Sequence, residues 1–305
     1  MHVTAVDTAS YAYVFAKTGI ELNRDDVDYL ELLNEMEKLN NVTPEAGYFT
    51  ETFCRQARYF QPHNGEKIDA VRNQIESDYK GSWLYEPLLA SLILGADRVD
   101  STTGVQMAYL KNWSARSRNQ MSLVEPGLLP GSGRAMQADA AKVLDDLPEV
   151  DLAYLDPPYN QHRYFANYHI WETLVRWDEP DAYGVAKKRV DVRTDEHRSD
   201  FNSKPKMYGA LSDVVSRLRA KTIILSYNNE SWLSRAELLG LVSDRPAVEI
   251  IDVDFKRYIG SQIGVYNKQG ERVGNPGAKR NTEQVLIAGE TDVVAKMLLA
   301  AQKHG

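Results

Sequence analysis

Cysteine is nearly absent from this chain of 305 residues, which holds Cys54 alone. A single cysteine cannot form an intrachain disulfide, and it excludes a cysteine-based zinc cluster. No apolar run reaches the about 18 residues that a membrane-spanning helix needs. The N-terminal residues also lack the basic-then-apolar pattern of a signal peptide. We therefore expect no membrane partner, no metal site and a cytoplasmic location.

The chain also lacks an excess of positive charge, because 36 Lys and Arg side chains stand against 43 Asp and Glu and the net charge is −7. This balance argues against indiscriminate binding of nucleic acid, although a local basic surface remains compatible with it. Residues 186–206 hold seven basic and four acidic side chains, and residues 256–280 hold six basic and one acidic. Such charge runs are either solvated loops or local contacts for a polyanion.

Hydrophobic patterns predict a mixture of strands and helices, which indicates an α/β fold. Expected strands cover residues 2–7, 134–138, 150–156, 221–229, 247–255 and 282–289, with "VDLAYLD" at 150–156 typical of a buried strand. Helical spacing fills residues 9–20 and much of 21–120, where "GVQMAYLKNW" extends it to about residue 118, and a closing helix covers 292–302. We expect residues 1–20 and 121–305 to form a catalytic domain, and 21–120 a helical insert.

Polar side chains follow several of the expected strands. Asp7, Asp139, the segment 156–159 and the segment 226–229 each stand where a strand ends. Ligands of α/β sheets bind outside the carboxyl ends of the strands. An Asp at such a junction can instead cap a helix, and an Asp beside proline is common in turns. Several such acids on one sheet nevertheless favour a cofactor site.

The segment Asp156-Pro157-Pro158-Tyr159 must end its strand abruptly, because two adjacent prolines lack N–H groups and have a fixed φ. It resembles the DPPY motif of S-adenosylmethionine-dependent DNA adenine-N6 methyltransferases. The wider stretches "YLDPPYNQHRYFANYHIWETL", "STTGVQMAYLKNW", "LSYNNESW" and "KRYIGSQIGVYN" are similar to bacterial methylases of the D12 class. The resemblance runs from about Val3 to Gly289 and implies a Rossmann-like methyltransferase sheet with a helical insert, within a restriction–modification system.

The residue types suit that reaction. The N6 nitrogen of adenine is a poor nucleophile, because its lone pair is delocalised into the ring. Acceptance of its hydrogens by the Asp156 carboxylate and the Pro157 carbonyl would localise the lone pair as the methyl group transfers. Pro158 keeps the corner rigid. Tyr159 would stack on a base extruded from the duplex.

The resemblance implies roles for further residues. Asp7 corresponds to the acid that binds the ribose of S-adenosylmethionine, Asp139 to the acid near the cofactor adenine, and Asp156 also borders the cofactor. Double-stranded DNA is the implied partner. Its expected contacts are Lys187, Lys188, Arg189, Arg193, Lys256, Arg257, Lys268, Lys279 and Arg280. The aromatic side chains at 164, 165, 168 and 171 follow at helical spacing and fit a core or pocket wall better than chemistry.

The sequence departs from the family in two elements. It shows neither the Gly-Ser-Lys-type segment nor the first strand with its glycine-rich turn, since "PGSG" at 130–133 precedes a strand and does not join one to a helix. Loss of that central strand would leave two unpaired sheet edges. We expect an N-terminally incomplete chain whose missing part comes from a second polypeptide or from upstream sequence, or a decayed copy. The alternatives to an active adenine methylase are a non-catalytic DNA-binding subunit or remnant, and an enzyme acting on cytosine N4 or an RNA base.

Overall fold

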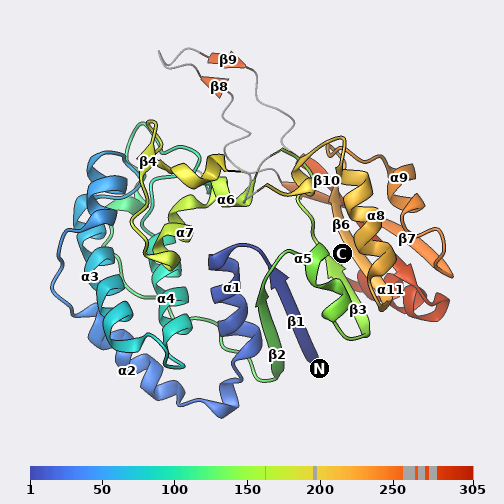
Figure 1. Ribbon diagram of the computed structural model, residues 1–305, viewed down its shortest axis with the longest axis horizontal. Coiled ribbons are helices and arrows are strands. Elements are labelled where there is room, and N and C mark those ends of the chain that lie inside the picture. Colours follow the sequence, from blue (N-terminus) through green and yellow to red (C-terminus); the bar gives the residue numbers. More distant parts are fainter. Residues whose placement is uncertain are drawn as a thin grey trace. The chain divides into compact units, whose positions relative to one another are not determined.

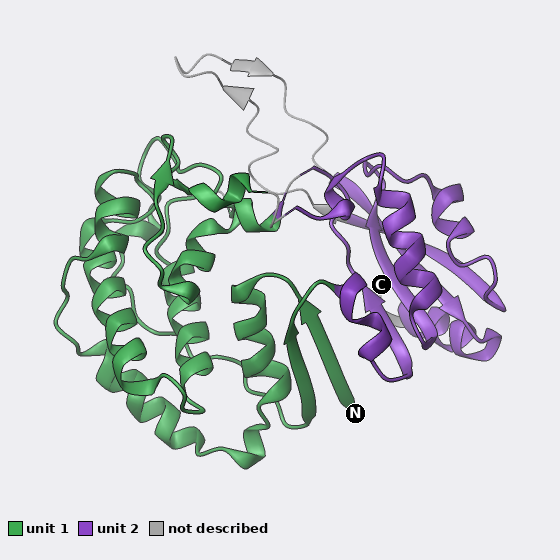
Figure 2. Ribbon diagram, viewed as in Figure 1, with its two compact units in different colours: residues 1–139, 164–197 green, residues 140–163, 198–305 purple. Residues whose placement is uncertain are grey.

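The computed structural model describes residues 1–102, 104–161, 163–194, 198–256, 265–266, 272–274 and 280–304. Strands and helices both contribute, as Figure 1 shows. The chain divides into two compact units, coloured in Figure 2: unit 1 is residues 1–139 and 164–197, and unit 2 is residues 140–163 and 198–305. This division differs from the expected boundaries, because the first two strands belong with the helices.

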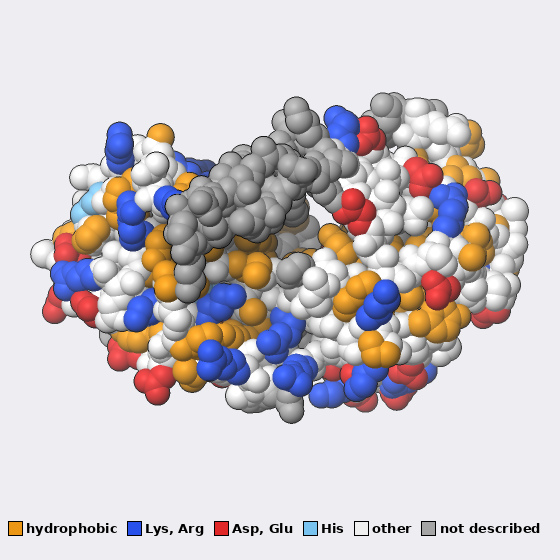
Figure 3. Space-filling view, turned by 90° about the horizontal axis from the view of Figure 1, so that it is seen from above, with side chains coloured by type: hydrophobic (Ala, Val, Ile, Leu, Met, Phe, Trp, Pro, Cys, Tyr) orange, Lys and Arg blue, Asp and Glu red, His pale blue; other side chains and the backbone are white. Residues whose placement is uncertain are grey.

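Charged side chains of both signs lie on the face of the molecule that Figure 3 shows. On the face shown in Figure 3, Lys and Arg side chains are scattered among acidic and apolar ones and form no single continuous patch. In the part of the chain that the structure describes, no helix is both long and apolar enough to cross a membrane.

Unit 1 begins with a parallel pair of strands, β1 (His2–Asp7) and β2 (Ser132–Gln137), in which Asp7 is opposite Gln137. Helix α1 (Ser10–Ala16) follows β1 and continues as a π-helical turn over Lys17–Glu21. The expected strand at 134–138 and helix at 9–20 are therefore present, with slightly shifted ends.

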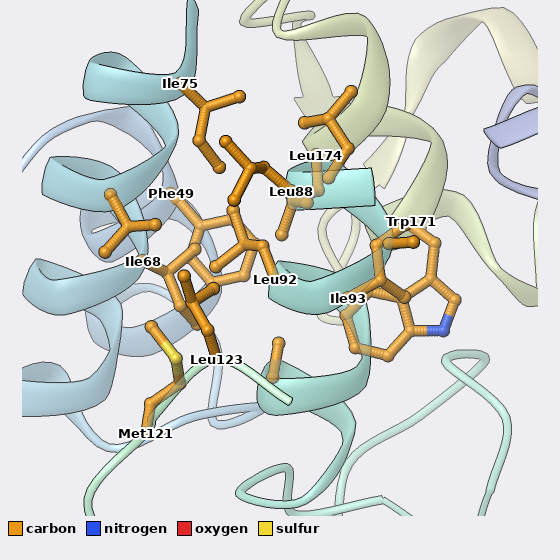
Figure 4. Packing of buried hydrophobic residues seen from close by; sticks show 14 of the residues in the cluster. Phe49, Ile68, Ile75, Leu88, Leu92, Ile93, Met121, Leu123, Trp171 and Leu174 are labelled. Atoms are coloured by element: carbon orange, nitrogen blue, oxygen red, sulfur yellow. The ribbon is translucent and has the colours of Figure 1, made fainter. Parts of the chain in front are cut away.

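The rest of unit 1 is helical. Its helices are α2 (Tyr29–Asn40), a π-helical segment (Thr50–Arg55), α3 (Pro62–Tyr79), α4 (Tyr85–Asp97), α6 (Tyr164–Asn167) and α7 (His169–Arg176). A short hairpin joins β4 (Ala182–Tyr183) to β5 (Lys188–Arg189). Helix α4 is apolar on every side, as expected for a helix surrounded by others. Figure 4 shows α3, α4 and α7 directing side chains into one cluster, which includes Ile68, Ile75, Leu88, Leu92 and Leu174.

The helix expected over "GVQMAYLKNW" is wrong. Residues 104–113 form turns and irregular chain, and only Arg116–Arg118 make a 3-10 turn. The apolar spacing misled because the buried side chain here is the polar Gln106, whose Oε1 accepts from Ile170 N at 2.8 Å. Gln106 N also donates to Asn167 O at 2.7 Å. Bonds to the α6–α7 region thus replace the bonds that a helix would make within itself.

Unit 2 contains a mixed four-stranded sheet in the order β3-β6-β10-β7. Strands β3 (Val150–Leu155) and β6 (Ala220–Asn228) are parallel, and β10 (Arg280–Gly289) is antiparallel to both β6 and β7 (Ala247–Lys256). The helices of unit 2 are α5 (Ala140–Val143), α8 (Met207–Arg217), α9 (Arg235–Gly240) and α11 (Thr291–His304). Two further short strands are β8 (Val265–Tyr266) and β9 (Arg272–Gly274). A mixed α/β architecture is therefore confirmed.

Strand β3 is an edge strand of its sheet, because among the described residues it pairs with β6 alone. Its side chains at Leu152 and Tyr154 are 46% and 62% exposed. The expectation of a buried strand was therefore wrong for these two positions, since an apolar run predicts burial only where both faces and both edges are covered.

Candidate functional site

The Asp156–Tyr159 loop begins where β3 ends. Leu155 is the last residue of β3 and lies opposite Leu225 of the parallel strand β6. Beyond that pair, Asp156 leaves the sheet while β6 continues to Asn228. The proline pair explains the break, because neither proline can donate a ladder hydrogen bond. The loop therefore lies at the carboxyl end of two parallel strands, the position where α/β sheets bind ligands.

Asp156 is solvent-accessible, yet the protein around it displaces part of its water. This desolvation raises the pKa of its carboxyl, and the negative charge of Glu283 raises it further. Glu283 lies on β10, where its Oε1 accepts a hydrogen bond from Ser226 Oγ at 2.7 Å. A raised pKa means that the surroundings stabilise the ionised form poorly, so donors on a bound molecule would interact with it favourably.

Tyr159 is half-buried beside the polar end of β6. Its ring meets the buried ring of Tyr227 edge to face, with centroids 6.0 Å apart and an interplanar angle of 71°. This arrangement is a favourable one for two aromatic rings. Tyr227 thereby fixes one edge of Tyr159 and restricts its orientation.

The far end of the loop is also held. Asn202 Nδ2 donates to the carbonyl oxygen of Asn160 at 2.8 Å. Asn202 belongs to a 3-10 turn, Asp200–Asn202, which Ser199 Oγ caps by accepting from Phe201 N at 3.2 Å. Sequence reasoning missed Asn202 and Glu283, because only the fold brings β10 and residues 199–203 to this loop. Tyr227 lies in the segment 226–229, which the sequence already placed at the end of a strand.

Asp7 and Asp139 lie at the carboxyl edge of the β1–β2 pair in unit 1. Asp7 ends β1, and Asp139 follows the end of β2 by two residues. The carbonyl of Asp7 accepts from Ala138 N at 2.9 Å, which keeps the two strand ends together. The structure thus places these two acids on one edge, as expected for parallel strands.

The carboxylate of Asp7 makes a local bond, with Oδ1 accepting from Ala9 N at 2.8 Å. Helix α1 receives no side-chain cap, so Asp7 orders the turn before the helix and does not cap it. Desolvation raises the pKa of Asp7, and the bonds from Ala9 and Thr8 oppose that rise. Its side chain remains exposed, which leaves carboxylate lone pairs accessible to a ligand.

Glu172 of α7 is a buried acid in the same unit that sequence reasoning missed. Its Oε1 accepts from Ser10 N at the start of α1 at 2.8 Å, and Oε2 lies 3.3 Å from Nε of Arg176. Burial raises the pKa of its carboxyl. Its only signal in the sequence is a single acid within the apolar run "HIWETLV". This hydrogen bond joins α7 to the first residue of α1, three residues after Asp7.

The expected DNA contacts have different surroundings. Lys187 and Lys188 are half-buried, Arg193 is exposed with its guanidinium 3.6 Å from the Tyr183 ring centroid, and Arg280 is exposed beside Asp254. Lys256 ends β7. Arg257, Lys268 and Lys279, together with the "RYIGSQ" segment, lie outside the described residues.

Arg189 does not suit the role expected for it. It is 2% exposed, and its guanidinium binds Asp178 at 2.6 and 2.7 Å and Asp191 at 2.8 Å. These two carboxylates raise the pKa of Arg189, despite the opposing effect of burial. The Arg189 guanidinium, which the sequence suggested as a DNA contact, thus neutralises two acids within unit 1.

Comparison with known proteins shows the family of this chain. The model of the D12 class N6 adenine-specific DNA methyltransferases matches residues 1–238. Modification methylase StsI of Streptococcus sanguinis is 32% identical over 263 residues, covering 81% of this chain and 40% of that protein. Type II methyltransferase M.NlaIII of Neisseria lactamica is 32% identical over 267 residues, covering 84% and 77%.

Type II methyltransferase M.CviAII of Paramecium bursaria Chlorella virus 1 is 27% identical over 262 residues, covering 83% of this chain and 76% of that protein. The chain spans about two fifths of the StsI methylase and about three quarters of the other two. No solved structure matches it with statistical significance. The comparisons give no support to the expected second polypeptide. With most of its residues matched by the family model, this chain belongs to the D12 class of N6 adenine-specific DNA methyltransferases.

Proposed function

We propose that this chain transfers a methyl group from S-adenosylmethionine to the N6 atom of adenine in double-stranded DNA, as the modification enzyme of a restriction–modification system. The observation that carries the proposal is the Asp156–Tyr159 loop at the carboxyl end of β3, in a chain of this family. The fold would be Rossmann-like. Its place of action would be the cytoplasm.

Asp156 and Pro157 would activate the nucleophile. The Asp156 carboxylate and the Pro157 carbonyl each accept one N6–H, so that the nitrogen lone pair localises as the amino group becomes positively charged. The raised pKa of Asp156 shows a carboxylate that is poorly solvated before the base arrives. Acceptors of this kind act most strongly on charge that develops in the transition state. Afterwards a proton leaves N6, and Asp156 is placed to accept it.

Tyr159 would hold the extruded base. A base inside the duplex cannot present N6 to Asp156, so it must leave the stack. Pro157 and Pro158 limit the conformations of the loop, and Tyr227 restricts the Tyr159 ring. Stacking on such a ring contributes roughly 1–3 kcal/mol per base.

Asp7 and Asp139 would bind the cofactor. S-adenosylmethionine supplies an electrophilic methyl group on a sulfonium centre. Its ribose offers two hydroxyl donors, which suit the exposed carboxylate of Asp7. Asp139 lies at the same edge and would accept from the adenine amino group, while Asp156 would border the cofactor from the catalytic loop.

DNA binding would combine the helices of residues 21–120, as an insert that contributes to target recognition, with basic side chains outside that insert. The proposed contacts are Lys187, Lys188, Arg193, Lys256, Arg257, Lys268, Lys279 and Arg280. Arg189 is omitted because of its burial. Phosphate contacts of this kind make the affinity fall steeply as salt rises.

The decisive experiment compares Asp156→Ala with Asp151→Ala in a methyl-transfer assay on duplex DNA, followed by nucleoside analysis. Asp151 is an exposed acid on the same strand that forms a surface ion pair with Lys221, so its loss is a matched control. We expect N6-methyladenine from the wild-type chain and from Asp151→Ala. Asp156→Ala should lower kcat about 100–1000-fold, the usual cost of losing one preorganised polar group.

Other outcomes would identify the alternatives. N4-methylcytosine in place of N6-methyladenine would overturn the substrate. DNA binding with neither S-adenosylmethionine binding nor methyl transfer would favour a non-catalytic subunit. Full activity of Asp156→Ala would overturn the mechanism.

A further inference from the structure

A cavity of about 470 Å³ lies beside the far end of the catalytic loop, wholly within unit 2. Gln161 and Arg163 form one side of it, directly after the Asp156–Tyr159 loop. Residues 198–206 form the other side, and Asn202 joins the two through its bond to the Asn160 carbonyl. The cavity wall is therefore physically continuous with the proposed catalytic loop.

The cavity is rich in positive charge. Arg163, Arg198 and Lys206 line it, and Asp200 is the carboxylate among the lining residues that the structure describes. Asp200 accepts from Lys206 Nζ at 2.9 Å, and both side chains of that pair are more than half exposed. Basic side chains therefore outnumber acidic ones among the described residues of the lining, in a chain whose net charge is −7.

Arg163 carries the strongest indication of a ligand. Its Nη1 atom is buried and has no hydrogen-bond partner among the described residues. A buried guanidinium N–H without an acceptor is costly, and few such groups persist in native proteins. An anion in the cavity would supply the missing acceptor.

We propose that this cavity binds a backbone phosphate of the DNA next to the target adenine, with Arg163 as its main ligand. The inference rests on the proposed function. Arginine suits phosphate because its planar fork can donate two parallel hydrogen bonds. Phosphate contacts set the register of a protein on DNA. A phosphate held four residues after Tyr159 would fix the sugar–phosphate chain from which the adenine is extruded.

The only other anion in the proposed reaction is the carboxylate of S-adenosylmethionine. The phosphate is favoured because three cations line the cavity, more than one carboxylate needs, and because the cavity adjoins the base-binding end of the loop. Loss of a phosphate ligand should weaken DNA binding, whereas loss of a ligand of the cofactor carboxylate should weaken binding of S-adenosylmethionine. Measuring both affinities therefore separates the two possibilities.

The test measures DNA affinity by fluorescence anisotropy over a salt series, using the full chain and a short duplex with its methylation sequence. Arg163→Ala should weaken binding about tenfold and lower the slope of log K against log salt by about 0.9, the value for one lost phosphate contact. Arg163→Lys should restore most of the slope, since it keeps the charge. Lys206→Ala, at an exposed position, should lower the slope by a smaller amount.

Lys221→Ala is the matched control, because Lys221 lies on β6 near its start, at the end of the strand away from the catalytic loop. Its salt slope should equal that of the wild-type chain. Binding of S-adenosylmethionine should be unchanged in all four variants. This second readout also shows that each variant is folded.

An unchanged slope in Arg163→Ala and Lys206→Ala, with the wild-type chain methylating DNA, would overturn the phosphate site and leave the proposed function intact. Loss of S-adenosylmethionine binding with the DNA slope unchanged would assign the cavity to the cofactor carboxylate and overturn the inference. A wild-type chain that shows no salt-dependent DNA binding would contradict the proposed function itself.

Discussion

Helix α4 and strand β3 have comparably apolar sequences but opposite surroundings. Leu88 and Leu92 of α4 are fully buried among helices of unit 1, whereas Leu152 and Tyr154 of β3 are 46% and 62% exposed. A helix satisfies its backbone by itself and needs only packing partners. A strand needs neighbours on both edges, and in unit 2 β3 has one. The difference separates a region built for stability from one that carries the proposed chemistry.

The largest effect should come from the helical core. Leu88→Ala removes a fully buried side chain from a cluster formed by α3, α4 and α7. We expect the free energy of unfolding to fall by about 2–5 kcal/mol, from lost burial and the cavity left behind. Urea denaturation followed by far-UV circular dichroism would measure it. A loss below about 1 kcal/mol would mean that this core is loosely packed and that the contrast with β3 is weaker than the burial suggests.

The stability of the helical core should also depend on pH, which the exposed residues of β3 do not predict. His169 of α7 is fully buried between Phe53 and Tyr59, and its Nε2 atom lies 3.0 Å from Gln106 O. Burial lowers its pKa to about 3, and the positive charges of Lys188 and Arg189 contribute. The unfolded chain therefore binds a proton at this site near pH 6.5, well before the folded protein does.

The direction of the pH dependence of stability follows from this difference in the pKa of His169 between the folded and unfolded chain. Stability from the neutral imidazole is fully present above about pH 6.5 and is lost as the pH falls from there towards about 3. The slope contributed by His169 should reach about 1.4 kcal/mol per pH unit. Urea unfolding at pH 7, 6 and 5 would be measured for the wild-type chain and for His169→Gln. The other titrating groups are the same in both proteins, so the difference between their slopes is the contribution of His169.

The contrast also explains what the sequence could predict. The strands at β1, β3, β6, β7 and β10 and the helix α11 follow from local apolar patterns, and the loop at Asp156 follows from its two prolines. Local pattern failed at Gln106, where a buried polar side chain holds an irregular segment. It also failed at Leu152 and Tyr154, because a run of apolar letters does not show which strands lie beside it.

The residues of the candidate site also fall into those that the sequence could predict and those that it could not. Asp7, Asp139 and the Asp156–Tyr159 loop were visible because polar residues after apolar strands form a local signal. Arg163, Glu172 and Glu283 were not, since their importance comes from partners that are distant in the sequence. For Arg189 the sequence predicted a role that the structure does not support. Its place in a basic segment suggested a DNA contact, and only the fold shows that Asp178 and Asp191 surround it.

The smallest effect should come from the exposed side chains of β3. Leu152→Ser and Tyr154→Ser remove apolar surface about half of which is already in water, so each should change the free energy of unfolding by no more than about 1 kcal/mol. Both should reduce aggregation, because an open apolar edge strand invites pairing with other chains. Urea unfolding and light scattering on the full chain would measure the two properties. A loss above about 2 kcal/mol at either position would show that something covers this edge in solution, and β3 would then belong with α4 as a buried element.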